Sequence, residues 1–165
     1  PDVRFLIAGP DRPVSRQIPQ TGSDFLRSRL APDHFSRVKI LGHMPLEHMP
    51  QVYQRANVLL APSRSETLSS ACVEAAGCGL AAIGARGTGM ESVIVHGETG
   101  FLEDVHQPEE FAKRILFLAD HPDISRRMGE RARRIVLERF SFEAVSRATV
   151  AMYEDVIHKR SRQHE

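Results

Sequence analysis

Apolar positions follow two different patterns along the first hundred residues of the chain. Short apolar runs closed by glycine or proline are typical of strands buried in a sheet, and they occupy residues 2–8, 38–41, 58–61, 80–83 and 100–102. Between these runs, spacings of three and four predict helices over residues 22–30, 46–56 and 90–95, with another helix following residue 66. This alternation of strands and helices indicates a parallel sheet.

Beyond residue 107 the pattern is helical throughout. Pro108 suits the first turn of a helix, and Glu109 and Glu110 follow it where the helix dipole favours carboxylates. We expect helices over residues 108–120 and 122–139 and a last one capped by Ser141. The apolar positions of that last helix are Phe142, Val145, Thr149, Met152 and Val156. The fold class predicted is α/β: a Rossmann-like parallel sheet with helices on both faces and a helical C-terminal cap.

Composition narrows the class without naming a function. A chain of 165 residues with 41% hydrophobic and 26% charged residues is large enough for one globular domain, predicted to span residues 1–165. Its 22 basic and 21 acidic residues leave a net charge of +1, which gives no field for steering nucleic acid. Cys72 and Cys78 cannot bridge within one helix, so we expect free thiols. These features and the lack of a long apolar run predict a soluble, cytoplasmic protein.

One helix carries a local basic surface. Six arginines follow Pro122, and we expect most of them to be solvated, with Glu130 and Glu138 as partners. Peripheral contact with an anionic membrane is the alternative interpretation. The six are Arg126, Arg127, Arg131, Arg133, Arg134 and Arg139.

The stretch from residue 61 to residue 79 has the composition of a binding site. It joins an apolar strand to a helix that we expect to begin with Thr67, Leu68, Ser69 and Ser70. The backbone N–H groups of a first helical turn have no partner within the helix, so they form a ready site for phosphate. The hydroxyls of Ser69 and Ser70 could add further hydrogen bonds.

Two glutamates flank that turn. Glu66 and Glu74 are eight positions apart, which along a helix is about 12 Å. The carboxyls of a retaining glycosidase lie only about 5 Å apart, so such a pair is excluded. The spacing suits two hydroxyl-rich groups joined by phosphates, such as a sugar and a ribose, with one carboxylate at each. Taken singly, either glutamate could be a helix-dipole partner or a solvated residue.

Other strand ends offer weaker candidates. Gly42, His43 and Met44 follow the second strand, where ligands of parallel α/β sheets bind. Residues 87–89, Gly-Thr-Gly, suit either a close approach to phosphate or a plain turn. No set of histidines and cysteines has the spacing of a zinc site, so no metal is expected.

Residues 57–102 resemble the donor-binding core of the GT-B fold glycosyltransferases, specifically the large retaining family 4. The resemblance extends from residue 2 to about residue 153 and is most specific in the Glu-seven-residues-Glu motif at Glu66 and Glu74. Pro62-Ser63 precedes that motif and residues 77–79, Gly-Cys-Gly, follow it. HGETGFL at residues 96–102 and FSFEAV at residues 140–145 match further family segments.

The resemblance implies a role for each candidate. Glu66 would contact the donor sugar as the catalytic candidate, and Glu74 would bind the ribose hydroxyls. The backbone of Thr67, Leu68, Ser69 and Ser70 would face the sugar and diphosphate, and Gly42, His43 and Met44 the nucleobase. The implied reaction is metal-independent transfer of a hexosyl group from a UDP-, GDP- or ADP-hexose, with retention of configuration.

The chain also departs from the family pattern. Thr67-Leu68-Ser69-Ser70 stands where the family commonly has Gly-Phe-Gly-Leu. The family's upstream strand with Gly-Arg and a Lys, and its N-terminal acceptor-binding domain, are not within the sequence. We therefore expect the chain alone to be inactive and to work with that domain. The alternatives are a non-catalytic nucleotide-sugar-binding or scaffold module and a different GT-B enzyme, such as a sugar-nucleotide epimerase.

Overall fold

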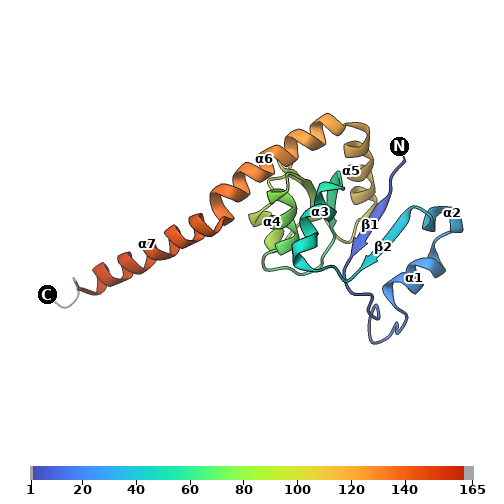
Figure 1. The fold of residues 1–165 in the computed structure, drawn as a ribbon, viewed down its shortest axis with the longest axis horizontal. Coiled ribbons are helices and arrows are strands. Elements are labelled where there is room, and N and C mark those ends of the chain that lie inside the picture. Colours follow the sequence, from blue (N-terminus) through green and yellow to red (C-terminus); the bar gives the residue numbers. More distant parts are fainter. Residues whose placement is uncertain (1, 162–165) are drawn as a thin grey trace.

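The computed structural model describes residues 2–161 and places all strands in parallel sheets (Figure 1). β1 (Phe5–Ala8) pairs with β2 (Val38–Gly42), and a second sheet has the order β3 (Val58–Ala61), β4 (Ala81–Ala85), β5 (Gly100–Glu103). The helices before residue 100 are α1 (Gly22–Arg29), α2 (Pro32–Phe35), η1 (Leu46–His48), α3 (Met49–Gln54), α4 (Ser70–Gly77) and η2 (Gly89–Ser92). α5 (Pro108–Asp120), α6 (Pro122–Phe140) and α7 (Phe142–Ser161) follow.

Helices cover both faces of the three-stranded sheet, which confirms the predicted fold class. The side chains of β4 alternate: Ala82 packs with residues of α4 and α6, whereas Ala81 and Ile83 pack with residues of α5. Ile83 is completely buried, which makes β4 the centre of the core. A strand covered on both sides needs apolar residues at every position, and this explains its uninterrupted apolar sequence.

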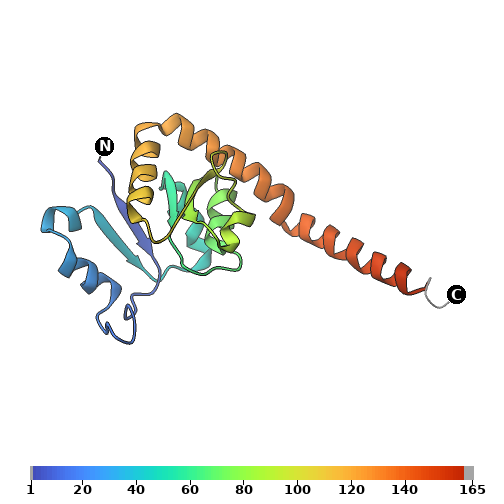
Figure 2. The same cartoon turned by 180° about the vertical axis from the view of Figure 1, so that it is seen from behind.

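The first strand departs from the prediction. We expected residues 2–8 to form a buried strand in one continuous sheet, and both expectations are wrong. Phe5, Leu6 and Ile7 are 37–39% exposed, and within residues 2–161 the only strand that pairs with β1 is β2. α1 contacts α2, and both helices lie near the β1–β2 pair, at the end of the molecule opposite α7 (Figure 2). The outer edge of β3 is likewise unpaired within residues 2–161.

The last helix extends away from the rest of the molecule (Figures 1 and 2). α6 packs against α4 and the sheet, with Met128, Ala132 and Val136 buried, whereas α7 continues beyond them. The predicted apolar positions of α7 are exposed, Phe142 by 83%. Within residues 2–161, no helix has the length and apolarity needed to cross a membrane.

Candidate functional site

The helix that follows the first glutamate begins later than predicted. α4 starts at Ser70, and Ser69 is its N-cap, with a hydroxyl that accepts a hydrogen bond from the Cys72 N–H at 3.4 Å. Ser69 is 4% exposed, so its hydroxyl serves the helix rather than a ligand. Thr67 and Leu68 lie in the preceding loop and are exposed. The free donors of the first turn therefore belong to Ser70 and Ala71.

The turn at residues 87–89 holds this loop in place. The Gly89 N–H donates to the Glu66 carbonyl at 2.8 Å, and a side chain on Gly89 would overlap the Thr67 carbonyl. The Thr88 hydroxyl accepts from the Met90 N–H and caps η2. The structure thus forms the strand-to-helix turn that the sequence allowed, and an approach to phosphate stays a prediction. The turn supports the loop that carries Glu66.

Glu66 and Glu74 differ from the other acidic residues of the described chain because they are partly buried and have no cationic partner. Four carboxylates between residues 2 and 161 are not classed as exposed, and two of these, Glu103 and Glu110, pair with Arg114 and Lys113 at 2.6 Å. Glu66 and Glu74 are half-buried and have no cationic partner among these residues. A half-buried carboxylate without a cation loses solvation and has no opposite charge to compensate for the loss, and such groups are typical of binding sites.

The carboxylate of Glu74 is held by Tyr53, which lies in the helix predicted over residues 46–56 but was not a candidate site residue. The Tyr53 hydroxyl donates to Glu74 Oε2 at 2.9 Å, across the contact between α3 and α4. Burial raises the pKa of Tyr53 far above its usual value, and the hydrogen bond to Glu74 adds to the shift. Since Glu66 precedes the helix, the 12 Å estimated from helical rise does not describe the distance between the two glutamates.

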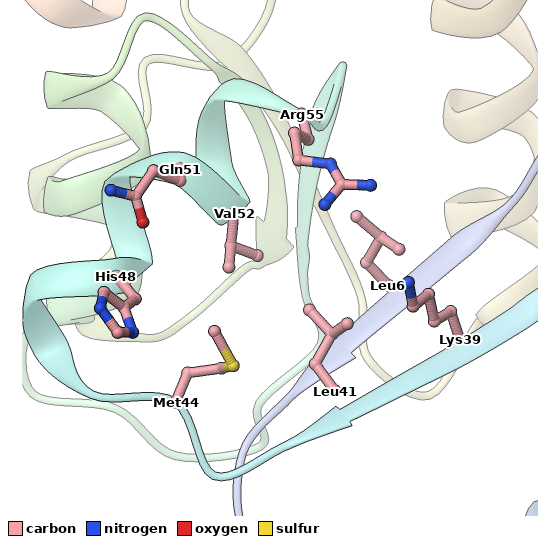
Figure 3. A pocket seen from close by; sticks show the side chains of 8 residues that line it. All are labelled: Leu6, Lys39, Leu41, Met44, His48, Gln51, Val52 and Arg55. Atoms are coloured by element: carbon pink, nitrogen blue, oxygen red, sulfur yellow. The ribbon is translucent and has the colours of Figure 1, made fainter.

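A pocket of about 290 Å³ opens beside the second candidate strand end (Figure 3). It lies between β1, β2 and α3, and its lining residues are Leu6, Lys39, Leu41, Met44, His48, Gln51, Val52 and Arg55. Of the three predicted nucleobase residues, Met44 lines this pocket, whereas His43 is exposed and lies outside the lining. The lining includes neither Glu66 nor Glu74. The sequence analysis missed Lys39 and Arg55, which stand within apolar patterns and belong to no motif.

Three of the six arginines of the basic helix form ion pairs within residues 2–161. Arg126 pairs with Glu130 at 3.1 Å, as predicted, and Arg127 pairs with Asp123 at 2.9 Å. The other predicted partner, Glu138, forms no ion pair within the described residues. Arg131 lies 3.5 Å from Glu98, at a surface hollow between α6 and the turn before β5. Membrane contact stays a prediction.

The cysteines and histidines give no sign of metal chemistry. Cys72 and Cys78 are free, as predicted, and burial raises the pKa of both thiols. His96 accepts the Leu102 N–H at 3.0 Å and so belongs to the turn that precedes β5. Residues 2–161 contain no group of three His, Cys, Asp or Glu side chains able to hold a metal ion. Metal independence itself stays a prediction.

Comparison with known proteins shows the family of the chain. The family model described as glycosyl transferases group 1 matches residues 1–135. The chain belongs to this family. Among curated relatives of this glycosyltransferase chain, N-acetyl-alpha-D-glucosaminyl L-malate synthase of Bacillus anthracis is 32% identical over 121 residues, which are 73% of the chain and 31% of the relative. D-inositol 3-phosphate glycosyltransferase of Corynebacterium kroppenstedtii is 34% identical over 122 residues, 74% of the chain and 27% of the relative. The chain thus spans about a third of these relatives' length.

Solved structures show the same fold for the glycosyltransferase chain. Anabaena HepE in complex with UDP has a TM-score of 0.81 at 21% identity, covering 94% of the chain and 42% of that protein. Sucrose-phosphate synthase from Thermosynechococcus elongatus has a TM-score of 0.77 at 23% identity, covering 93% of the chain and 38% of that protein. Both similarities confirm the α/β architecture with its parallel sheets and helices.

Proposed function

We propose that this chain is the donor-binding part of a retaining hexosyltransferase, which transfers a hexosyl group from a nucleoside-diphosphate sugar to an acceptor. The observation that carries the proposal is the pair Glu66 and Glu74: half-buried carboxylates without a cation on either side of a helix N-terminus. Family membership supports glycosyl transfer. The fold neighbour Anabaena HepE was solved with UDP and with UDP-glucose, and this supports a nucleotide sugar as the donor class.

Each part of the donor has a place in this proposal. Glu66 accepts hydrogen bonds from the hexose hydroxyls, and Glu74 accepts them from the ribose. The N–H groups of Ser70 and Ala71 face the diphosphate, where the helix dipole stabilises negative charge. Along the helix, Glu74 lies four residues beyond Ser70, about 6 Å of rise, which suits a ribose next to a diphosphate. Gly42 and Met44 stand on the nucleobase side, and no metal is required.

The negative charge of the diphosphate needs more stabilisation than the helix N-terminus of α4 provides. As the sugar leaves, the diphosphate gains negative charge, which preorganised donors and cations stabilise in such reactions. The helix N-terminus offers dipoles, but Arg64 is exposed and belongs to no part of the motif. We propose that further cations come from another part of the longer protein.

We also propose that this other part completes the sheet and packs against α7. β1 and β3 each have an edge unpaired within residues 2–161, and the side chains of β1 are exposed on both faces. Such edges normally pair with another strand. On α7, Phe142, Val145 and Met152 lie on one side of the helix and are at least 50% exposed, which suits a globular partner such as an acceptor-binding domain.

The test is a transfer assay with the full-length protein. The protein is incubated in turn with UDP-, GDP- and ADP-hexoses, the released nucleoside diphosphate is measured, and the anomeric configuration of the product is read by NMR. We expect release from one nucleotide class and retained configuration. Inverted configuration would overturn the retaining assignment, and no release of nucleoside diphosphate from any of the nucleotide sugars would overturn the function.

A further inference from the structure

We propose that Tyr53 is a positioning residue that orients the carboxylate of Glu74 for recognition of a ribose diol. This inference rests on the proposed function, since it assigns a second residue to the same site. It gives the site a source of selectivity for ribonucleotides over 2′-deoxynucleotides. Its basis is the 2.9 Å hydrogen bond between the Tyr53 hydroxyl and Glu74 Oε2.

The tyrosine ring is held firmly. Tyr53 is 6% exposed and packs in one apolar cluster with Ala75 and Leu80, so its ring bridges α3 and α4. Ala75 is the residue next to Glu74, and therefore the cluster fixes the backbone beneath the carboxylate as well. Because the Tyr53 ring and the backbone at Glu74 are both fixed, the tyrosine hydroxyl stays within hydrogen-bonding distance of Oε2. A glutamate with several rotatable bonds then loses much of its freedom before any ligand arrives.

The hydrogen bond from Tyr53 leaves one oxygen of the Glu74 carboxylate available to a ligand. Oε2 is occupied by the tyrosine, whereas Oε1 has no hydrogen-bonding partner in the described part of the chain. One carboxylate oxygen has two acceptor sites, enough for the two O–H groups of a vicinal diol. A tyrosine hydroxyl is protonated throughout the physiological pH range, because its usual pKa of about 10 lies above that range, and burial raises the pKa of Tyr53 further.

A purely structural role for Tyr53 makes a different prediction. If the ring only filled the core, phenylalanine would replace it without changing how Glu74 meets a ligand. Loss of the hydroxyl would then alter stability or shift all affinities together. A positioning role instead changes the ratio of the affinities for a ribonucleotide and for its 2′-deoxy form, because the 2′-hydroxyl is a group that Glu74 binds. Tyr153, which is 60% exposed on α7, is the other tyrosine of the sequence and the matched control.

The experiment compares a nucleotide with its 2′-deoxy form by calorimetry on the full-length protein. UDP, GDP and ADP are tested first, and the preferred one is then paired with its 2′-deoxy counterpart. We expect the wild type to favour the ribonucleotide by about tenfold, the loss expected for one charge-assisted hydrogen bond. Tyr53→Phe should reduce this ratio at least about threefold, Tyr153→Phe should leave it unchanged, and Glu74→Ala should abolish it.

The ratio of ribonucleotide to deoxynucleotide affinity in Tyr53→Phe is the decisive readout, and the double variant checks that Tyr53 makes no contribution of its own. Because Tyr53 acts through Glu74, the double variant Tyr53→Phe/Glu74→Ala should show the same ratio as Glu74→Ala alone. A wild-type ratio in Tyr53→Phe would overturn the positioning role while leaving Glu74 as the ribose ligand. A wild type that binds ribo- and deoxynucleotides equally would overturn the ribose assignment itself. Urea unfolding of each variant separates either result from loss of folding.

Discussion

The backbone N–H of Gly89 donates to the carbonyl of Glu66 at 2.8 Å, which ties the turn after β4 to the loop that carries the first glutamate. The two residues are far apart in sequence, yet the turn sets the loop's shape. The absence of a side chain at residue 89 is what permits the contact, since a Cβ there would overlap the Thr67 carbonyl.

Replacing Gly89 with alanine should therefore displace the loop. We expect Gly89→Ala to destabilise the protein by about 1–3 kcal/mol, the usual cost of forcing an extra carbon into a packed site, and to weaken nucleotide-sugar binding as well. Gly77→Ala is the control, because Gly77 ends α4 with open space around it. Urea unfolding and calorimetry on both variants check this. Equal stability and affinity in Gly89→Ala and wild type would show that the loop does not depend on the turn.

The N-cap of α4 gives a second prediction. Removing the Ser69 hydroxyl leaves the Cys72 N–H unpaired in a buried place, so Ser69→Ala should cost about 1 kcal/mol of unfolding free energy. Ser70→Ala, at an exposed position of the same turn, should change stability by less than about 0.5 kcal/mol. Chemical denaturation distinguishes the two. A larger loss in the Ser70 variant would place the helix start elsewhere.

The buried hydroxyl of Tyr53 predicts a pH dependence of stability. The folded state raises the pKa of this phenol above its unfolded value of about 10, so the folded protein holds the proton more tightly than the unfolded chain. The resulting stability is fully present below about pH 10 and is lost as the pH rises from there through the folded pKa, by up to about 1.4 kcal/mol per pH unit. In urea unfolding, the free energy of unfolding of Tyr53→Phe should change less with pH than that of the wild type between about pH 9 and pH 11. Parallel curves for the two proteins would contradict the assignment.

The ion pair at the end of β5 should contribute to stability. Glu103 is 8% exposed and accepts from Arg114 Nε at 2.6 Å, and the guanidinium of Arg114 lies 4.4 Å from the centre of the Phe101 ring. Glu103→Gln should cost about 1–3 kcal/mol, since it weakens a largely buried charge-assisted bond. Glu110→Gln removes the more exposed bond to Lys113 and should cost less than about 1 kcal/mol. Thermal unfolding of the two variants compares them, and equal losses would contradict the difference in burial.

The hydrophobic pattern predicted most elements because each strand run and each helical spacing is a local property of the sequence. It placed β4 and α6 within two residues of their observed bounds, and the completely buried Ile83 lies in a predicted strand. It misjudged β1, because an apolar run shows which residues favour burial but not whether another element covers them. The exposure of Phe5 and Leu6 depends on which strands pair.

The site was only partly predictable for the same reason. Thr67, Ser69 and Ser70 are all residue types that favour helix starts, so local preference could not choose among them. The distant turn at Gly89 and the burial of Ser69 determine that the helix begins after Ser69. The hydroxyl of Tyr53 meets Glu74 across 21 positions of sequence, and no periodicity reports such a tertiary contact.

The central claim is that Glu66 binds the hexose of the donor and that Glu74 binds the ribose of its nucleotide. The most direct test measures, by calorimetry on the full-length protein, the affinities of the preferred nucleotide sugar and of its free nucleoside diphosphate in wild type, Glu66→Gln and Glu74→Ala. Glu66→Gln should weaken the nucleotide sugar by about tenfold and leave the free nucleotide unchanged, whereas Glu74→Ala should weaken both. Wild-type affinities for both ligands in both variants would contradict the claim.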